Sequence, residues 1–336
     1  MKALFLEGAK NFKMSDIPRN DDKDKVTIKV KAIGICGTEI SAYKAVFPMG
    51  VYPRTLGHEI AGEVVRVPEN NKDIKIGDRV ALDPYKYCGT CYPCSIGRTN
   101  CCEDLKVIGV HENGAYMEYF SHDIHLIHKA PDDMPWEHIA LIEPLTISIH
   151  GVHRAGVKKG EHVVITGAGA IGLLAAQFVL YLEAIPILVD PMEKRLEIAK
   201  KLGVEYTFNP MTQDVIKEIK KVTNGRMAEA VVEASGAPAA VRSAIDYVSY
   251  AGRISLVGYP KDDIPLPTFL FTKKELDVRG SRNSAKEFPL AIQLIAENKI
   301  NLDPIITNII KFDQIPEYFE LLMKNPNDYL KVIAKL

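Results

Sequence analysis

The chain has 336 residues, 47% hydrophobic and 25% charged, a balance that excludes an intrinsically disordered protein. Lys and Arg total 42 against 43 Asp and Glu, so the net charge of −1 gives no sign of a nucleic-acid partner. The length suits about two domains, and without a membrane-spanning run or signal peptide we expect a cytoplasmic protein with no membrane partner.

Short β-like segments separated by turns rich in Gly and Pro dominate the first part of the chain. Clear examples are residues 26–33, 60–67 and 79–82. No long helical pattern comes before about Pro135. This stretch is therefore predicted to be a β-rich, loop-rich unit.

Six short apolar strands alternate with helices after Gly160. The predicted strands are residues 162–166, 187–190, 204–207, 230–234, 253–258 and 276–280. The predicted helices run from the glycine turn to about residue 183 and over 193–202, 213–222 and 238–248. This alternation predicts an α/β fold with a parallel, doubly wound sheet.

The last part of the chain is predicted to return to the first domain. A helix over residues 286–299 leaves the α/β unit, a second helix covers 316–324, and a strand-like tail covers 329–336. We therefore expect a discontinuous first domain, residues 1–150 and 286–336. A Rossmann domain, residues 151–285, interrupts it.

A G-x-G-x-x-G pattern follows the strand 162–166 and opens a helix. It consists of Gly167, Gly169 and Gly172, with Ile171 inside the turn. The first glycine allows the tight turn, the second lets the backbone approach a pyrophosphate, and the third lets helix and strand pack closely. The pattern predicts a dinucleotide site, and the alternative is a turn that binds no cofactor.

Asp190 stands at the end of the next strand, 23 residues after Gly167. Its carboxylate is expected to accept hydrogen bonds from the adenosine ribose and to repel a 2′-phosphate, which favours NAD over NADP. Arg195 is expected to flank the adenine end. The alternative for Asp190 is a helix N-cap.

Five of the six cysteines fall between residues 88 and 102. The spacing C-x2-C-x2-C-x7-C is typical of a closed tetrahedral zinc site with a structural role. Cys88, Cys91 and Cys94 supply three ligands, and either Cys101 or Cys102 supplies the fourth. An iron–sulfur cluster is the alternative, although ferredoxin runs have different spacing.

A second set of metal-binding residue types is spread over the first domain. Cys36 lies in GICGTE, His58 and Glu59 lie in GHEIAGEV, and Glu143 lies in LIEP. A thiolate, an imidazole and one or two carboxylates would suit zinc with one position left for water or substrate. Their spacing in sequence does not show that they meet in space.

Together these motifs resemble the zinc-containing medium-chain alcohol dehydrogenase family. The matching features include GICGTE, GHEIAGEV, GDRV at 77–80, the cysteine run, Glu143-Pro144 and GAGAIG, in family order over nearly the whole chain. The resemblance is closer to polyol and sugar-acid dehydrogenases than to ethanol enzymes. Through GVHENG and SRNSAKEFP it is closest to the starvation-sensing, L-galactonate dehydrogenase-like branch. It implies a GroES-like catalytic domain, a Rossmann NAD-binding domain, one catalytic zinc and one structural zinc.

The resemblance also implies the chemistry. Cys36, His58 and either Glu59 or Glu143 would hold the catalytic zinc, and the fourth structural ligand would be Cys102. A secondary alcohol on a polyol or sugar acid would be oxidised to a ketone, with hydride passing to NAD. The proton would leave through Thr38.

Four further residues near the expected site follow from the family pattern. Glu39 is expected to contact His58. Many relatives end their proton relay on a His five residues after the catalytic Cys, but here Ser41 stands there, which leaves the last relay step open. Tyr43 and His111 are expected to line the substrate pocket, with a surface loop as the alternative for His111.

Arg282 is expected to bind a sugar-acid carboxylate. The alternatives for Arg282 are a solvated charge and a cofactor contact. An L-threonine-type dehydrogenase and a catalytically weak NAD-binding regulatory protein are alternative functions. Relatives are typically homodimers or homotetramers, and residues 256–270 are a candidate intersubunit edge.

Overall fold

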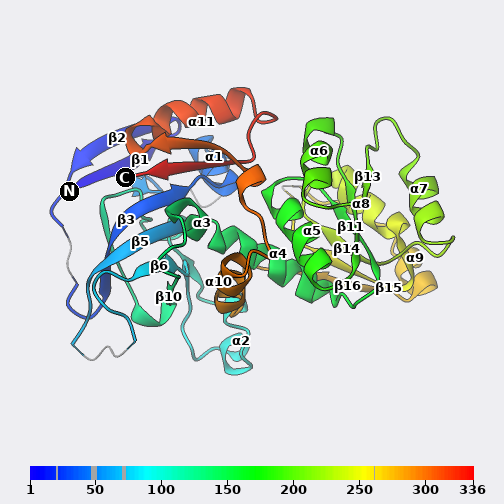
Figure 1. Cartoon of the computed structure of the whole chain (residues 1–336), viewed down its shortest axis with the longest axis horizontal. Helices are drawn as coiled ribbons and strands as arrows, with labels where there is room; N and C mark the ends of the chain where they lie inside the picture. The colour runs from blue at the N-terminus through cyan, green and yellow to red at the C-terminus, as the bar shows by residue number, and fades with distance from the viewer. Residues whose placement is uncertain (20–21, 47–50, 70–72, 261) are drawn as a thin grey trace. The chain divides into compact units, whose positions relative to one another are not determined.

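The computed structural model describes residues 1–19, 22–46, 51–69, 73–260 and 262–336. These residues form two compact units (Figure 1). The first unit comprises Met1–Glu143, Phe288–Ala296 and Ile306–Leu336, and the second comprises Pro144–Glu287 and Glu297–Ile305. Within the described residues, the helices are too short or too polar to cross a lipid bilayer.

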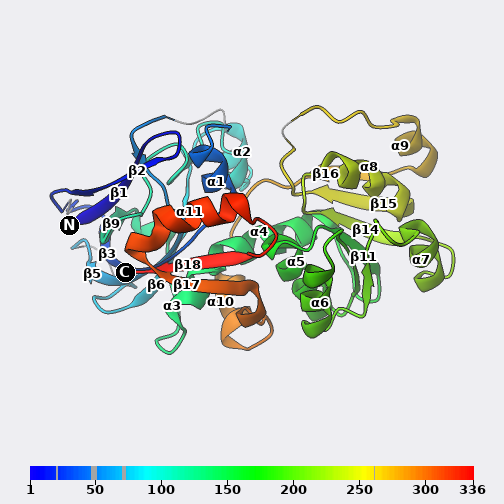
Figure 2. The ribbon, with the colours of Figure 1, turned by 90° about the horizontal axis from the view of Figure 1, so that it is seen from above.

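The first unit is built on a sheet with the strand order β10-β6-β5-β3-β18-β17, and β9 also pairs with β3. The bounds are β3 (Val26–Gly34), β5 (Glu59–Arg66), β6 (Arg79–Leu82), β9 (Tyr119–His122), β10 (Ile127–Lys129), β17 (Ile306–Lys311) and β18 (Lys331–Lys335). Figure 2 shows β17 and β18 side by side. β18 pairs with β3 on one edge and with β17 on the other, so the C-terminal tail lies inside the sheet that the N-terminal strands form.

Smaller elements surround this sheet. A three-stranded sheet has the order β2-β1-β4, and β7 pairs with β8. The strands are β1 (Lys2–Gly8), β2 (Asn11–Asp16), β4 (Arg54–Thr55), β7 (Tyr85–Lys86) and β8 (Lys106–Val107). The helices are α1 (Gly37–Tyr43), α2 (Tyr92–Ser95), α3 (Trp136–Ala140), α10 (Phe288–Ala296) and α11 (Ile315–Lys324), with short 3-10 turns at η1 (Thr99–Cys101), η2 (Ile124–Leu126) and η4 (Phe312–Gln314).

The core of the first unit is apolar and includes residues from both ends of the chain. The core contains the almost fully buried Ile28 and Ile33 of β3 and Ile60 of β5. Tyr116, which precedes β9, and Phe319 of α11 are buried to the same degree. β3 is buried over most of its length because it pairs with β5 on one side and with β9 and β18 on the other. This strand therefore provides a rigid support for the loop that follows it.

The second unit contains a six-stranded parallel sheet with the order β13-β12-β11-β14-β15-β16. The strands are β11 (His162–Thr166), β12 (Ile185–Val189), β13 (Tyr206–Phe208), β14 (Ala228–Glu233), β15 (Val248–Leu256) and β16 (Asp277–Gly280). This order is that of the dinucleotide-binding doubly wound sheet, with the switch point between β11 and β14. The predicted α/β fold class is confirmed.

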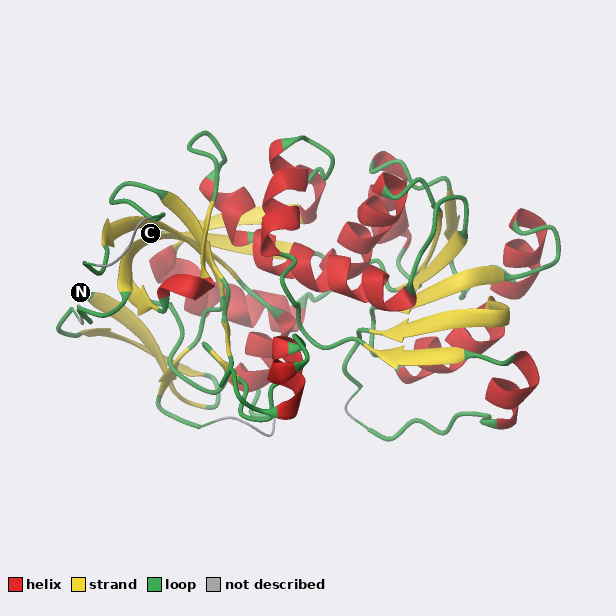
Figure 3. Ribbon diagram, turned by 90° about the horizontal axis from the view of Figure 1, so that it is seen from below, coloured by secondary structure: helices red, strands yellow, loops and turns green. Residues whose placement is uncertain are grey.

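Helices flank the parallel sheet, as Figure 3 shows. They are α4 (Ile142–Ala155), α5 (Ala170–Tyr181), α6 (Glu193–Lys201), α7 (Val215–Val222), α8 (Pro238–Tyr247) and α9 (Phe269–Lys274), and the short turn η3 (Asp303–Ile305) also belongs to this part of the chain. α4 begins two residues before the second unit does, because that unit starts at Pro144.

One strand boundary differs clearly from the prediction. β15 begins at Val248 and not at residue 253. Tyr250-Ala251-Gly252 is typical of a turn, and Ala251 does have a positive φ of 53°. The strand nevertheless pairs with β14 from Val248 onward, with a register irregularity that accommodates this residue.

Candidate active site

Four cysteines of the loop after β7 converge on one point. The Sγ atoms of Cys88, Cys91, Cys94 and Cys102 all lie within 4.8 Å of one another. Cys91 Sγ and Cys102 Sγ are 3.8 Å apart, which is about the sulfur–sulfur spacing of a tetrahedron with Zn–S bonds of ~2.3 Å. Cys101 is not part of this cluster, so Cys102 is the fourth member, as the resemblance implied.

Backbone amides point at these sulfur atoms. The amides of Thr90 and Cys91 donate to Cys88 Sγ at 3.4 Å each, and the amide of Cys88 donates to Cys102 Sγ at 3.3 Å. The bonds from Thr90 and Cys91 lower the pKa of the Cys88 thiol to about 6. Because thiolates are the form that binds metals, the loop is arranged for a structural zinc site.

A second cluster forms where the end of β3 lies beside the start of β5. Cys36 follows β3 and caps α1, His58 precedes β5, and Glu59 begins β5 opposite Gly34. One ligand atom from each of Cys36, His58 and Glu59 lies within 4.8 Å of the others. His58 and Glu59 are only 5% and 1% exposed and so are shielded from bulk water, whereas Cys36 is partly exposed.

Glu39 holds the imidazole of His58. His58 Nδ1 lies 3.0 Å from Glu39 Oε1, which also accepts the amide of Gly57 at 2.9 Å. Tyr116 donates to Glu39 Oε2 at 2.7 Å. Burial alone would raise the pKa of Glu39, but the charge of His58 and these hydrogen bonds lower it. The expected Glu39–His58 contact is confirmed, and it leaves Nε2 as the nitrogen for a metal.

The two carboxylate oxygens of Glu59 have different surroundings. Oε1 forms a buried ion pair with Lys331 Nζ from β18. Oε2 is buried and has no hydrogen-bond partner among the described residues. A Cβ at Gly34 would overlap this oxygen, so only glycine leaves room for it. A carboxylate with an orphaned oxygen, converging with a thiol and an imidazole, fits a bound cation.

Lys331 is a site residue that the sequence motifs do not reveal. It is 272 positions from Glu59 and begins the C-terminal strand, where three apolar residues follow it. Burial alone would lower the pKa of Lys331, but the charges of Glu59 and Cys36 raise it. No local motif could have indicated it, because its contact with Glu59 depends on the pairing of β18 with β3.

Glu143 lies outside the cluster of converging ligand atoms. Its Oε1 accepts a short hydrogen bond from the hydroxyl of Tyr85, a second residue that no motif indicated. Burial raises the pKa of Glu143 to about 7. The structure therefore groups Glu59, and not Glu143, with Cys36 and His58.

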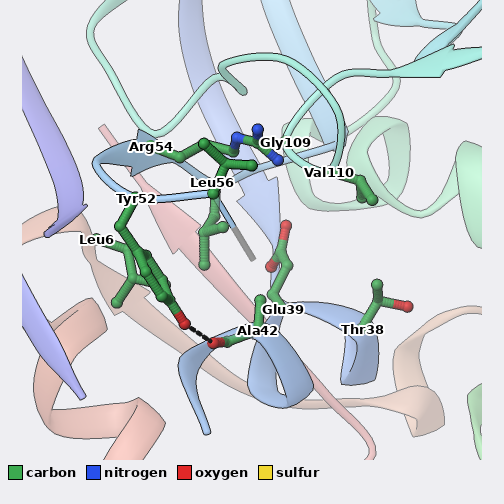
Figure 4. Close-up of a pocket in the computed structure, with 10 residues that line it drawn as sticks. Leu6, Thr38, Glu39, Ala42, Tyr52, Arg54, Leu56, Gly109 and Val110 are labelled. Carbon is green, nitrogen blue, oxygen red and sulfur yellow. Dashed lines mark hydrogen bonds between the residues drawn. The ribbon is translucent and has the colours of Figure 1, made fainter. Parts of the chain in front are cut away.

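Thr38 and the predicted substrate residues have different positions. Thr38 lines a hollow of the first unit (Figure 4). His111 lines an adjacent, more open hollow, and its Nδ1 accepts the amide of Val107 at 2.9 Å. Arg282 is exposed and belongs to the second unit, while Ser41 is partly buried in α1.

The expected substrate contact of Tyr43 is wrong. Its ring is buried against Phe12 and Phe319, and its hydroxyl donates to Glu320 at 2.8 Å. Five residues along a helix correspond to a rotation of about 140° relative to Thr38. Tyr43 therefore packs into the core while Thr38 faces the hollow.

The glycine turn of the second unit is shaped for a close ligand. Gly167 has a φ of 97°, and a Cβ at Gly172 would overlap the carbonyl oxygen of Gly167. At Gly169 no protein atom lies within 4 Å of the Cβ position, so the backbone is open to approach. Gly169 also caps α5 at its N-terminus, where a phosphate is favoured.

Asp190 follows β12 and is held by two backbone amides. Its Oδ2 accepts the amide of Ala168 at 2.7 Å and its Oδ1 accepts the amide of Met192 at 2.8 Å. Ile171 lies in the first turn of α5 and Arg195 lies in α6. The carboxylate is thus fixed directly beside the glycine turn.

Known proteins share these features. The chain matches the alcohol dehydrogenase GroES-like domain over residues 22–132 and the zinc-binding dehydrogenase domain over residues 170–297. It is 51% identical to an uncharacterized zinc-type alcohol dehydrogenase-like protein of Haemophilus influenzae, over 99% of this chain and 98% of that protein. The chain belongs to the zinc-binding medium-chain alcohol dehydrogenase family. Membership makes it a zinc-dependent oxidoreductase with a GroES-like domain and a Rossmann domain.

Two further similar proteins bear on activity and cofactor. The chain is 37% identical to the L-galactonate-5-dehydrogenase of Escherichia coli, over 98% of each chain. A protein of Escherichia coli CFT073 described as a short chain alcohol dehydrogenase has been solved in complex with NADH. That structure has a TM-score of 0.93 and 29% identity, covering 100% of this chain and 99% of the other.

Proposed function

We propose that this protein is a zinc- and NAD-dependent dehydrogenase that interconverts a secondary alcohol and a ketone on a polyol or sugar acid. The observation that carries the proposal is that Glu59, whose buried Oε2 has no hydrogen-bond partner among the described residues, converges with the Cys36 thiol and the His58 imidazole. The relatives' activities on sugar acids support the substrate class. Homodimer or homotetramer formation and a cytoplasmic location stay predictions.

The donor set of the first unit fits zinc. Cys36, His58 and Glu59 would hold the ion, and when bound it supplies the Lewis acidity that lowers the pKa of a substrate hydroxyl. Glu39 fixes the orientation of His58 through Nδ1, and Lys331 orients Glu59 through Oε1. Glu143 is the alternative carboxylate, and its protonation is tied to the hydroxyl of Tyr85.

Thr38 is proposed to take the proton that leaves the substrate hydroxyl. It lies in the first turn of α1, two residues after Cys36, and lines the hollow that a substrate could enter. Ser41 cannot act as a base near neutral pH, so we infer that the proton passes from the Thr38 hydroxyl to water. The relay in this chain would therefore end at solvent.

The second unit is proposed to bind NAD. The open backbone at Gly169 would face the pyrophosphate, and Asp190 would accept hydrogen bonds from the ribose hydroxyls. Gly167, Ile171 and Gly172 shape the turn, and Arg195 would flank the adenine. A negative carboxylate at Asp190 disfavours a 2′-phosphate, which supports NAD over NADP.

The proposal is tested by metal content and turnover together. NADH formation at 340 nm is measured for zinc-loaded protein across polyols, sugar acids, L-threonine and simple alcohols. Cys36→Ala is expected to abolish turnover and to reduce zinc from two ions to one per chain. Cys101→Ala is the matched control, because Cys101 is a cysteine outside both clusters. This variant should keep its turnover and its two zinc ions per chain.

Three outcomes would contradict parts of this proposal. Full turnover by Cys36→Ala would refute the catalytic metal site. A clear preference for L-threonine would change the substrate class but keep the zinc and NAD assignments. No turnover, with zinc only at the cysteine loop, would favour an NAD-binding regulatory protein.

A further inference from the structure

Two neighbouring hollows of the first unit share the side chain of Arg54. The inner hollow is lined by Thr38, Glu39, Arg54, Leu56 and Val110 among others (Figure 4). The outer, more open hollow is also lined by Arg54 and Val110, and it adds Lys106, His111 and Glu112. Arg54 therefore lies between the space at Thr38 and the space open to solvent.

The charge of Arg54 has no counterpart among the described residues. Its guanidinium makes no hydrogen bond or ion pair with any residue that the structure describes, although Arg54, the first residue of β4, is partly buried. The other charges of the outer hollow are compensated within the protein. Lys106 pairs with Asp104 at 2.8 Å, and Glu112 pairs with Lys86 at 2.7 Å. These two ion pairs leave Arg54 as the uncompensated positive charge of the wall.

The remaining polar groups of the inner hollow are engaged by the protein. Tyr52 donates its hydroxyl to the carbonyl of Ala42 at 2.8 Å (Figure 4). The carboxylate of Glu39 is occupied by His58 and by the hydrogen bonds described above. Thr38 and Arg54 are thus the two groups in the described lining whose hydrogen-bonding capacity is left for a ligand, and the wall between them is largely apolar.

We propose that Arg54 is a specificity-determining residue that binds an anionic group at one end of the substrate while the reacting hydroxyl lies at Thr38. The inference rests on the proposed function and deepens it. A planar guanidinium binds a carboxylate or a phosphate through two parallel hydrogen bonds, and both groups share this chemistry. The sugar-acid carboxylate that the sequence assigned to Arg282 is thereby assigned to Arg54, since Arg54 shares a hollow with Thr38.

The kinetic test compares substrates that differ only at the end that Arg54 would bind. Zinc-loaded wild type, Arg54→Gln and Arg54→Lys are assayed with a hexonate such as L-galactonate, the neutral hexitol and a hexitol phosphate. In Arg54→Gln the kcat/KM ratio of the preferred anionic substrate to the hexitol should fall at least tenfold, mainly through KM. Arg54→Lys should recover part of the ratio, because it keeps the charge but not the two-point geometry.

A matched control and a fold check accompany these variants. Lys106→Gln removes a cation of the outer hollow that is already paired with Asp104, and its ratio should stay within twofold of wild type. Thermal melting of each variant reports whether it is folded. Collapse of the phosphate ratio, rather than the hexonate ratio, would identify phosphate as the anionic group and still support the role of Arg54.

Other outcomes would overturn the inference. An unchanged ratio in Arg54→Gln would do so, as would a wild type that prefers the neutral hexitol to both anionic compounds. Absence of turnover with every substrate would instead count against the proposed function. In that case, calorimetric titration of the hexonate and the hexitol phosphate into the protein with NADH tests the role of Arg54 in binding without turnover. Binding of either compound that is lost in Arg54→Gln supports the inference, and equal binding or none to wild type contradicts it.

Discussion

At the scale of single residues, the ion pair between Glu59 and Lys331 is the most consequential contact of the site. Both side chains are almost fully buried. Lys331 pairs with Oε1 of Glu59, and Oε2 has no hydrogen-bond partner among the described residues. Removing one member of a buried pair leaves an uncompensated charge, which costs roughly 3–5 kcal/mol. Zinc binding to Glu59 would offset that cost.

We therefore predict that Lys331→Met destabilises the zinc-free protein by about 3 kcal/mol and that zinc restores more stability in the variant than in wild type. Urea unfolding with and without zinc measures both effects. Lys335→Met is the matched control, because Lys335 lies on the same strand but pairs with Glu137 near the surface, and it should cost about 0.5 kcal/mol. Equal losses in the two variants would contradict the role of the buried pair.

His122 makes folding stability depend on pH. It is 2% exposed, its Nε2 lies 2.8 Å from the carbonyl oxygen of Asp83, and burial lowers its pKa to about 4. The unfolded chain binds a proton near pH 6.5, whereas the folded chain does so only near pH 4. The stability contributed by neutral His122 is therefore complete above pH 6.5 and is lost as the pH falls toward 4.

The lowered pKa of His122 is expected to reduce the free energy of unfolding by about 2 kcal/mol between pH 8 and pH 5. His122→Gln keeps an N–H donor for Asp83 but cannot titrate, so its stability should fall less between pH 8 and pH 5. Urea unfolding at the two pH values gives the difference from wild type directly. Parallel losses in wild type and variant would show that His122 titrates normally in the folded state.

The residue scale also shows where sequence motifs suffice. The four cysteines and the glycine turn could be predicted because all their members lie within a few residues of one another. Cys36, His58 and Glu59 could be selected as residue types, but their meeting depends on the pairing of β3 with β5. Lys331 and Arg54 could not be predicted, because no local pattern distinguishes a buried or unpaired cation from a surface one.

At the scale of elements, the cysteine loop is a small structure with few apolar residues of its own. It contains only the four-residue helix α2 and the turn η1 between Cys88 and Cys102. Its order should therefore come from the metal. Cys94 is buried among the four sulfur atoms, and burial raises the pKa of its thiol to about 12 in the absence of an ion.

Cys94→Ser is predicted to lose the structural zinc on dialysis and to lower Tm by about 5 °C or more. Limited proteolysis should then cut within residues 88–102 before the rest of the chain. Cys101→Ala should keep its zinc and its protease resistance, since Cys101 is not part of the cluster. Retention of both zinc ions by Cys94→Ser would exclude a four-thiolate site.

Elements within the regular alternation of strands and helices could be predicted, whereas isolated short helices could not. The strands β11 and β16 and the helices α6 and α8 lie close to their predicted ranges, because apolar strands alternating with helices give a clear signal. α1 and α9 have only seven and six residues, too few for a periodic pattern to appear. α1 forms because the carboxylate of Glu39 accepts the amide of Cys36 at its N-terminus, and this contact depends on the finished site.

At the scale of the whole molecule, the first unit is assembled from both ends of the chain. β18 lies between β3 and β17, so the last residues complete a sheet that the first residues begin. The sequence could predict that the tail returns, because a lone apolar segment needs a sheet to join. It could not predict the neighbouring strands or the register, which place Lys331 at Glu59.

This arrangement makes the tail essential to the stability of the first unit. Ile333 on β18 is fully buried, while its cross-strand partner Ile309 on β17 is 50% exposed. Ile333→Ala is predicted to destabilise the first unit by about 3 kcal/mol through lost burial and the cavity left behind. Ile309→Ala removes the same atoms from the paired position and should cost less than about 1 kcal/mol.

Urea unfolding followed by zinc-dependent turnover reports on the first unit, and NADH binding to the same samples reports on the second. Ile333→Ala should shift the turnover midpoint to lower urea well before NADH binding is lost. If Ile333→Ala and Ile309→Ala shift the turnover midpoint equally, burial of β18 contributes no more to stability than that of a surface strand. If NADH binding is lost at the same midpoint, the two units unfold as one, and the tail then stabilises the entire chain rather than the unit whose sheet it completes.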